Sequence, residues 1–425
     1  MKPSLTATSP PATRLIDGLT TGLKNSADSK WVQQFSTLPP LALYIHLPWC
    51  EHKCPYCDFN SHPASSASAD GSLPQQGYID ALIADLDSHL PQIWGRTLTT
   101  IFIGGGTPSL FSPAVIDRLL SEVRQRLPFN DLNEVTMEAN PGALEQSKLP
   151  GFRQAGINRL SLGVQSFNDD ALKQLGRIHD AAQAQKAIEA AQTAGFNSFN
   201  IDLMFGLPGE SNTQTIDQAI TDLTTALSYD PAHLSLYQLT LEPNTAFAKQ
   251  PPALPDDDLI ADMQTALHQQ LADSEYQHYE VSAFSKPNLA CKHNANYWQF
   301  GDYLGIGAGA HSKISCADKI IRERKIKDPL RYQSAALKGD GRAESRQVDP
   351  KELPFEFMLN AMRLQQGVPL SLFGKQTGLP LTTLLPGIER GRELGLIEVD
   401  NQQLMPTQQG HQYLNNLIEL FLPDA

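Results

Sequence analysis

The stretch Tyr44-Ile-His-Leu-Pro-Trp-Cys50-Glu-His-Lys-Cys54-Pro-Tyr-Cys57 places three of the five cysteines in the pattern C-x3-C-x2-C. Thiolates are soft ligands that suit an iron–sulfur cluster or zinc. Zinc needs a fourth ligand to complete a tetrahedron, and the neighbouring candidates are His46, His52 and Asp58. Crowded thiols have no packing purpose, so the stretch predicts a metal centre. The residues alone leave both metals open.

The cysteines follow the first of six strand-like apolar runs that alternate with amphipathic helical patterns. Such alternation predicts a parallel sheet, either open or closed into a barrel. The chemistry of these folds gathers at the carboxyl ends of the strands. The predicted strands are 43–47, 100–103, 134–138, 159–164, 198–204 and 233–239; predicted helices include 114–127, 181–194 and 215–227.

Composition excludes several classes of protein. The chain has 425 residues and a net charge of −13. An acidic chain has no electrostatic footprint for nucleic acid, and no apolar stretch approaches the roughly 18 residues of a membrane span. Five cysteines are too few for a disulfide framework. With no signal-peptide pattern at the start, these features predict a cytoplasmic protein without an integral membrane segment.

Polar residues and glycines stand where the predicted strands end. Gly104-Gly105-Gly106-Thr107-Pro108 follows the second strand, and Glu138 ends the third. Gln165 and Asp202 end the fourth and fifth strands, and Arg177 lies between them. Any one of these residues alone is typical of a solvated surface. At consecutive ends of parallel strands they predict a single pocket, in which glycine permits close backbone approach.

A C-x3-C-x2-C motif after a first strand resembles the radical S-adenosylmethionine (SAM) superfamily. The resemblance implies one [4Fe–4S] cluster on Cys50, Cys54 and Cys57, with SAM on the open iron. It implies that Arg177 binds the SAM carboxylate, that Gln165 and Asp202 bind ribose hydroxyls, and that Glu138 meets the amino group or sulfonium. The other residues implied at the cofactors are Tyr44, Tyr56, Gly105, Gly106, Thr107 and Leu304, the last from the block Tyr303-Leu304-Gly305-Ile306-Gly307.

Within that superfamily the chain is similar to the branch of oxygen-independent coproporphyrinogen III dehydrogenase (HemN) and the heme chaperones (HemW). The dehydrogenase pattern has a further cysteine where this chain has Phe59. The block His293-Asn-Ala-Asn-Tyr-Trp298 resembles a heme-chaperone pattern, which makes His293 a candidate axial heme ligand. Without the resemblance the block is typical of a structural aromatic turn. Cys291 is a weaker candidate ligand, and Cys316 is expected to be inert.

The expected fold is α/β, a partial (β/α)6 radical SAM barrel with a C-terminal helical, winged-helix-like domain. The expected parts are a mobile tail over 1–40, the barrel over 41–285, a connecting segment over 286–348 and the C-terminal domain over 349–425. The Ser/Ala-rich segment 62–76 is expected to be an exposed loop. A basic run over 319–327 is either a solvated face or a site for propionates or an acidic partner.

The resemblance implies a heme chaperone that carries a cluster and SAM and delivers heme to hemoproteins, respiratory enzymes among them, within porphyrin metabolism. The alternatives are a coproporphyrinogen III dehydrogenase and a radical SAM methyltransferase, so the resemblance leaves open whether the chain is an enzyme. The resemblance also implies an electron donor such as flavodoxin or ferredoxin, and it leaves a homodimer as one alternative for the oligomeric state.

Overall fold

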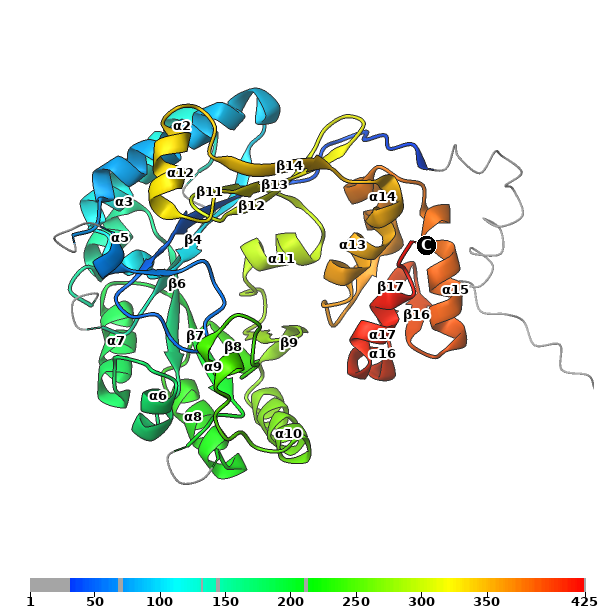
Figure 1. Cartoon of the computed structure of the whole chain (residues 1–425). Coiled ribbons are helices and arrows are strands. Elements are labelled where there is room, and N and C mark those ends of the chain that lie inside the picture. Colours follow the sequence, from blue (N-terminus) through cyan, green and yellow to red (C-terminus); the bar gives the residue numbers. More distant parts are fainter. Residues whose placement is uncertain (1–30, 68–71, 131–132, 143–145, 210–212, 424–425) are drawn as a thin grey trace, which may run out of the picture.

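A computed structural model describes residues 31–67, 72–130, 133–142, 146–209, 213–423. Its centre is a curved sheet with helices on the outer, convex side and a separate C-terminal domain facing the open side (Figure 1). All six predicted parallel strands are present. They are β1 (Leu41–Leu47), β4 (Leu98–Gly105), β5 (Glu134–Ala139), β6 (Arg159–Gln165), β7 (Ser198–Phe205) and β8 (His233–Gln238). The predicted partial barrel is therefore confirmed.

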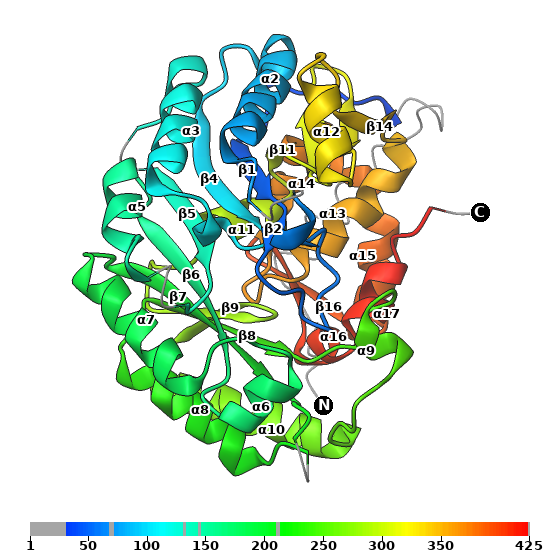
Figure 2. The same ribbon diagram turned by 60° about the vertical axis from the view of Figure 1, so that its left-hand side comes forward.

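Helices in the connections cover the outer side of the sheet, as the 60° view shows (Figure 2). They are α2 (Gln75–Ile93), α3 (Pro113–Arg126), α5 (Leu149–Ala155), α6 (Asp169–Gln174), α7 (Ala181–Thr193), α8 (Ile216–Ser228) and α10 (Asp257–Asp273). Asp180 and Thr215 start α7 and α8 with capping boxes, which satisfy free N–H groups of the first turn. Ser112 precedes α3 but makes no side-chain cap bond, and Pro113 is the first residue of that helix.

Within the described residues the main sheet has 12 strands, in the order β14-β13-β12-β11-β1-β4-β5-β6-β7-β8-β10-β9. The strand β11 (Asp302–Ile306) lies parallel to β1, while β12 (His311–Ser315), β13 (Ile320–Lys325) and β14 (Arg342–Gln347) continue antiparallel. At the far end β10 (Ala283–Ser285) and β9 (Gln277–Glu280) are also antiparallel. The segment 286–348, expected to connect two domains, thus supplies four strands of the main sheet.

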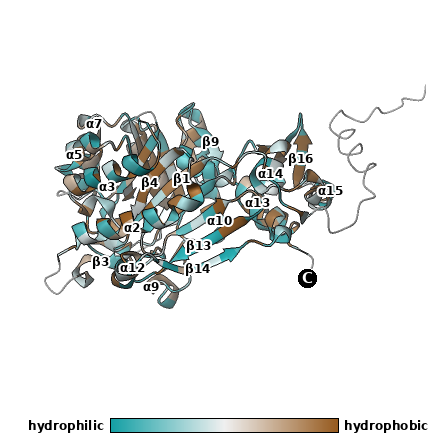
Figure 3. Cartoon of the chain, turned by 90° about the horizontal axis from the view of Figure 1, so that it is seen from above, coloured by the Kyte–Doolittle hydropathy of each residue, from teal (hydrophilic) through white to brown (hydrophobic). Residues whose placement is uncertain are grey.

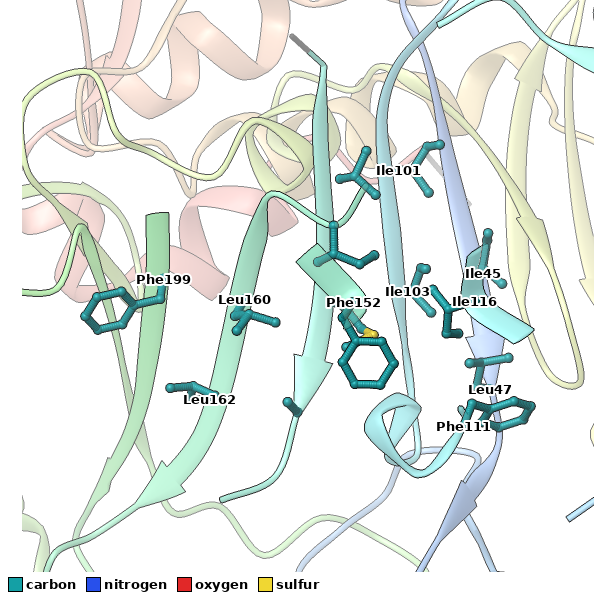
Figure 4. Packing of buried hydrophobic residues seen from close by; sticks show 14 of the residues in the cluster. Ile45, Leu47, Ile101, Ile103, Phe111, Ile116, Phe152, Leu160, Leu162 and Phe199 are labelled. Atoms are coloured by element: carbon teal, nitrogen blue, oxygen red, sulfur yellow. The ribbon is translucent and has the colours of Figure 1, made fainter. Parts of the chain in front are cut away.

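Each central strand divides its side chains between two environments. Leu43 and Ile45 of β1, with Ile101 and Ile103 of β4, point to the outer helices and belong to the main core. Figure 4 shows Ile45, Ile101 and Ile103 among the side chains gathered on one face of the sheet. Successive residues of a strand face opposite sides, so the residues between them point into the barrel. There the chain has Tyr44, His46, Phe102, Glu138, Ser161, Asp202 and Ser235.

A second core forms the C-terminal domain around Phe357, Phe373 and Ile388. Its helices are α13 (Leu353–Ala361), α14 (Leu370–Thr377), α15 (Leu385–Glu393), α16 (Gln408–Gln412) and α17 (Leu414–Glu419). Its three-stranded sheet joins β15 (Val368–Pro369), β17 (Gln403–Pro406) and β16 (Ile397–Asp400). Seen from above, β13 and β14 run from the barrel toward this domain with largely hydrophilic colouring (Figure 3).

Two expected loop regions have more structure than predicted. Of the expected tail 1–40, residues 1–30 lie outside the described residues. Residues 31–40 are not a free tail, because Gln33 Nε2 donates to the Thr377 carbonyl at 2.9 Å and Phe35 packs against the C-terminal core. In the segment 62–76, β3 (His62–Pro63) pairs with β2 (Trp49–Cys50), and Gln75 already begins α2.

Among the described residues, no helix combines the length and the hydrophobicity that crossing a bilayer requires.

The outer face holds a buried ion pair between Lys325 and Asp85, which we use to test the packing. Lys325 Nζ lies 2.6 Å from Asp85 Oδ1, and both side chains are 0% exposed. Removing one partner of a buried pair leaves the other charge unpaired, so Lys325→Met should lower the free energy of unfolding by about 3–5 kcal/mol. Urea denaturation measures the change. Arg324 precedes Lys325 in the chain and forms an exposed ion pair with Glu344. Arg324→Met should therefore lower the free energy of unfolding by no more than about 1 kcal/mol. Equal effects of the two substitutions would contradict the packing.

Candidate functional site

The three cysteines lie on a loop that is held at both ends. The loop leaves β2 at Cys50, and the pairing of Trp49 with His62 of β3 closes its base. Inside the loop, Lys53 Nζ donates to the carbonyls of Phe59 at 3.2 Å and Ser61 at 3.1 Å. All three cysteine side chains line one cavity of about 500 Å³, here called the main cavity. The loop therefore presents its thiols together at the carboxyl ends of the strands.

Three thiols that line one cavity are a donor set that suits an iron–sulfur cluster. In the described part of the chain, no three His, Cys, Asp or Glu side chains converge closely enough to hold one metal ion. A zinc site would require such convergence, whereas a cluster distributes its thiolates over separate iron atoms. Burial raises the pKa of the Cys50 and Cys57 thiols. Metal binding at these thiols must then release protons.

The glycine run connects the end of β4 to the cysteine loop. A Cβ atom on Gly106 would lie 2.5 Å from the Trp49 carbonyl oxygen, and one on Gly105, whose φ is +116°, would strike the His46 ring. The backbone N–H groups of Gly106 and Thr107 donate to the carbonyls of Leu47 and Trp49, both at 2.8 Å. Gly105, Gly106 and Thr107 also line the main cavity. The glycines thus position Cys50 as well as leaving space beside it.

Three predicted strand-end residues, Glu138, Gln165 and Asp202, meet in the main cavity. The Glu138 carboxylate accepts from the Gly105 N–H at 3.0 Å, and Asp202 accepts from Asn200 Nδ2 at 2.7 Å. Burial, with a further contribution from the Asp202 charge, raises the pKa of Glu138 to about 7. Gln165 has a φ of +72° at an irregularity in β6, which turns the chain end into the cavity. The sheet thus brings acceptor-rich groups together opposite the cysteine loop.

Arg177 lies directly beside the cysteine loop. Its Nη1 atom is 3.6 Å from Cys54 Sγ, and its Nη2 atom donates to Asn140 Oδ1 at 2.8 Å and to the Gly163 carbonyl at 2.7 Å. Among the described residues its buried Nε has no hydrogen-bond partner. A fixed guanidinium here favours negative charge on the cysteine sulfurs and on any carboxylate that enters the cavity.

The two predicted tyrosines, Tyr44 and Tyr56, line different cavities. Tyr56 lines the main cavity, with its ring centroid 6.4 Å from that of Phe247. Tyr44 instead lines a second cavity of about 390 Å³, here called the side cavity, and its hydroxyl lies 3.0 Å from His46 Nδ1. Both cavities are lined by Asp58, Phe59, Gly105 and Glu138. Phe59, the residue at the position of the dehydrogenase cysteine, therefore stands in their common wall.

His293, the candidate axial heme ligand, is buried, and its Nε2 has no hydrogen-bond partner among the described residues. It belongs to α11 (Lys292–Trp298), on the concave side of the sheet (Figure 1), and is 1% exposed. Its Nδ1 is 2.9 Å from Thr100 Oγ1, its ring packs against Phe102, and it lines neither cavity. Burial lowers its pKa to about 3, so the imidazole is neutral as a heme ligand requires. It lacks the required exposure, because Glu134 accepts the N–H groups of Lys292 and His293 and fixes the helix inside the barrel.

Two further candidate residues, Leu304 and Cys291, do not line either cavity. Leu304 lies in the core between sheet and helices, because it occupies an outward position of β11; its neighbour Tyr303 lines the side cavity. Cys291 is buried, with its sulfur 3.5 Å from Glu134 Oε1, and does not line either cavity.

Sequence reasoning missed the floor of the main cavity. Arg159, Ser161, Asn200 and His233 all line it from inward positions of β6, β7 and β8. Asn200 donates to Asp202 and to Ser161, so these side chains form a continuous polar network. The signal was available in the sequence: each residue alternates with apolar neighbours of a predicted strand, which makes it an inward position.

Comparisons with known proteins agree with this geometry. Residues 44–220 match the Radical SAM superfamily, and residues 348–413 match the HemN C-terminal domain. The heme chaperone HemW of Haemophilus influenzae is 46% identical over 392 residues, which cover 91% of this chain and 99% of that protein. The heme chaperones HemW of Escherichia coli and Bacillus subtilis are 45% and 35% identical, over 99% and 98% of their lengths and 91% and 89% of this chain.

A solved structure shares the fold over almost the whole chain. Coproporphyrinogen III oxidase (HemN) from Escherichia coli, a radical SAM enzyme, matches with a TM-score of 0.75. The match covers 95% of this chain and 98% of that one, at 23% sequence identity. At this identity the likeness establishes the architecture, including the C-terminal helical domain.

The raised pKa of Glu138 predicts a pH dependence of stability. A proton held more tightly in the folded state stabilises the fold below about pH 4.5, and this stabilisation is lost as pH rises toward the folded pKa of about 7. The free energy of unfolding should fall by up to about 3 kcal/mol over this range. In Glu138→Gln, which cannot titrate at this position, this pH-dependent fall should be absent. Urea denaturation of the metal-free protein between pH 5 and pH 8 measures it. The surface variant Glu122→Gln should keep the wild-type profile; parallel profiles for wild type and Glu138→Gln would contradict the prediction.

Proposed function

The chain belongs to the HemW family of the radical SAM superfamily, and on this premise we propose that it binds heme and delivers it to hemoproteins. The observation that carries the proposal is the similarity to proteins named heme chaperone HemW over 98–99% of their lengths. Phe59 supports it, because that position carries no thiol and its side chain is 60% exposed in the wall between the two cavities.

We propose Cys50, Cys54 and Cys57 as the ligands of a [4Fe–4S] cluster with one open iron. The three thiols line one cavity, and Arg177 beside Cys54 compensates the negative charge that a thiolate-bound cluster brings. Because of this contact, removing the Arg177 guanidinium should change the cluster environment as well as the SAM site. When bound, the cluster supplies an electron for cleavage of SAM.

SAM is proposed to occupy the remainder of the main cavity. Arg177 suits its carboxylate, and Gln165 and Asp202 suit its ribose hydroxyls. Glu138 is placed to take up the positive charge of the amino group or sulfonium. Because its pKa is raised to about 7, binding of a cation near neutral pH should be coupled to loss of the Glu138 proton.

The enzyme alternative, coproporphyrinogen III dehydrogenase, keeps a supporting observation. The floor of the main cavity retains Arg159, whose Nε is buried without a hydrogen-bond partner among the described residues. A guanidinium at that depth suits a substrate carboxylate. The two candidate functions make different predictions: a dehydrogenase converts coproporphyrinogen III, whereas a chaperone binds heme and passes it on unchanged.

Further parts of the proposal concern partners and place. We propose a cytoplasmic protein that receives electrons from a flavodoxin- or ferredoxin-like donor and transfers heme to acceptor hemoproteins. Its net charge of −13 supports the absence of nucleic acid among its partners.

The cluster predicts a definite metal content. Anaerobic reconstitution should load about four irons per chain, and replacement of Cys50, Cys54 or Cys57 by Ala should remove most of that iron. Iron analysis and the visible spectrum measure both. Cys316→Ser, at a half-buried cysteine outside both cavities, is the matched control and should load iron normally. One tightly bound zinc and no iron would contradict the assignment.

The chaperone proposal is tested by comparing heme transfer with enzymatic turnover. The reconstituted protein should bind hemin stoichiometrically and pass it to an apo-hemoprotein, followed by the absorbance of the acceptor. In a parallel anaerobic reaction with SAM, a reductant and coproporphyrinogen III, it should form no more than trace protoporphyrinogen IX. Multiple-turnover formation of that product would restore the dehydrogenase, and failure to bind hemin would end the chaperone proposal.

A further inference from the structure

The far end of the cysteine loop is attached to a part of the sheet outside the six parallel strands. Asn60 lies three residues after Cys57, and its Nδ2 donates to the carbonyls of Ala308 and Lys327, both at 2.9 Å. Ala308 belongs to the turn 307–310 between β11 and β12, and Lys327 follows β13. The loop therefore has a second attachment, separate from the contacts of the glycine run.

Two buried tyrosines hold this turn from the helix side of the sheet. The Tyr78 hydroxyl on α2 accepts from the Ala308 N–H at 2.8 Å. The Tyr332 hydroxyl on α12 (Pro329–Ala336), a helix beside α2 (Figure 2), accepts from the Gly307 N–H at 2.9 Å. Both tyrosines are fully buried. Because a buried N–H without a partner is costly, removing either hydroxyl should loosen the turn.

Each tyrosine hydroxyl also donates a hydrogen bond, so its direction is fixed. Tyr78 donates to the His46 carbonyl at 3.1 Å, and Tyr332 donates to Asp85 Oδ2 at 2.7 Å. The other oxygen of Asp85 accepts from Lys325 Nζ. A carboxylate can only accept, so the Tyr332 proton points to Asp85 and its lone pairs face the turn. The buried ion pair of the outer face therefore orients a hydroxyl that holds the turn.

His46 holds Asn60 from the inner face of the sheet. Its Nε2 lies 2.9 Å from the Asn60 carbonyl, and its Nδ1 lies 3.0 Å from the Tyr44 hydroxyl. Burial lowers the pKa of His46 to about 4, so the ring is neutral and carries one N–H. A carbonyl can only accept, which places this proton on Nε2 and leaves Nδ1 to accept from Tyr44. Asn60 is therefore fixed through its backbone as well as its side chain.

Two glycines let the turn lie directly against these groups. A Cβ atom on Gly307, whose φ is +107°, would strike the His46 carbonyl, and one on Gly309, whose φ is +77°, would strike the Asn60 amide. The turn is therefore in close contact with both β1 and the cysteine loop. A displacement of the turn displaces Asn60 as well.

We propose that Tyr78 and Tyr332 are positioning residues of the cysteine centre, which act through the turn 307–310 and Asn60. The assignment rests on the proposed [4Fe–4S] site and adds to it two residues that line neither cavity. Their hydroxyls touch no ligand group; they determine where the far end of the loop lies.

The thiols should differ in how strongly they depend on this attachment. Cys57 is close to Asn60 in the chain, and its Sγ lies 3.7 Å from Ser61 Oγ. Cys50 is held instead by the pairing of β2 with β3. Loss of the attachment should therefore release Cys57 more than Cys50.

The first test uses the metal-free, full-length protein, because alkylation of its thiols reports the loop without a cluster. Three variants each remove one contact: Tyr78→Phe, Tyr332→Phe and Asn60→Ala. Each should speed alkylation of Cys57 by iodoacetamide several-fold, since burial raises the pKa of this thiol and a released thiol regains its ordinary reactivity. Peptide mass spectrometry resolves the cysteines, and Cys316 should react at the wild-type rate. Wild-type Cys57 rates in all three variants would overturn the proposal.

A matched control separates positioning from a general loss of stability. Tyr276→Phe also removes a buried tyrosine hydroxyl, one that donates to the Pro231 carbonyl beside β9 at the far edge of the sheet. It should lower the urea midpoint, as Tyr78→Phe does, but leave alkylation of Cys57 at the wild-type rate. Equal acceleration in Tyr276→Phe would mean that stability alone is responsible and would overturn the proposal.

A double variant tests the route through Asn60. If the hydroxyls act through Asn60, Tyr78→Phe should add little to the acceleration that Asn60→Ala causes by itself. Independent effects on the Cys57 rate would instead multiply in the double variant. A multiplied rate would overturn the route.

The reconstituted protein tests the consequence for the cluster. Tyr78→Phe and Tyr332→Phe should load iron, lose it to a chelator several-fold faster than wild type, and show a changed electron paramagnetic resonance signal after reduction with dithionite. Tyr276→Phe should match wild type in both measurements. Wild-type iron retention and signal in the first two variants would overturn their role at the cluster. If the wild-type protein itself loads no [4Fe–4S] cluster, the proposed cluster site fails, which is a separate outcome from the alkylation result.

Discussion

The alternation of side chains along six parallel strands is the constraint on which the rest of the molecule depends. Leucine, isoleucine, valine and phenylalanine at one set of positions build the core beneath the helices. The intervening positions then point inward, where Glu138, Ser161 and Asp202 form a polar interior. Because the strands are parallel, their carboxyl ends lie on one edge. A single folding requirement thus produces both the stability of the barrel and the composition of its cavity.

Close backbone contacts fix the cysteine loop against the end of the sheet. Gly105 and Gly106 allow the end of β4 to approach the turn after β1, where larger residues would strike His46 and Trp49. The resulting backbone bonds hold the loop from one side, and Arg177 approaches Cys54 from the other. The positions of the thiols are therefore set by the sheet, although the loop itself contains little regular structure.

The two cavities differ in the groups that line them. The main cavity keeps the thiols and acceptor groups suited to a cluster and SAM, while the side cavity adds aromatic and basic groups. Phe59 stands between them and is exposed.

The sequence alone determined the six strands, and it predicted the cavity that the three cysteines share with Glu138, Gln165, Arg177 and Asp202, because period-two patterning and strand ends are local features. It did not determine that β11 joins the sheet beside β1, since that pairing connects residues far apart along the chain. This pairing directs Leu304 outward and Tyr303 inward, and the continuation of the sheet through β12 brings His311 to a cavity. Likewise His293 belongs to a chemically suggestive motif, yet its contacts with Thr100 and Glu134 bury it. Exposure depends on which distant segments cover a residue, and that is decided by tertiary packing.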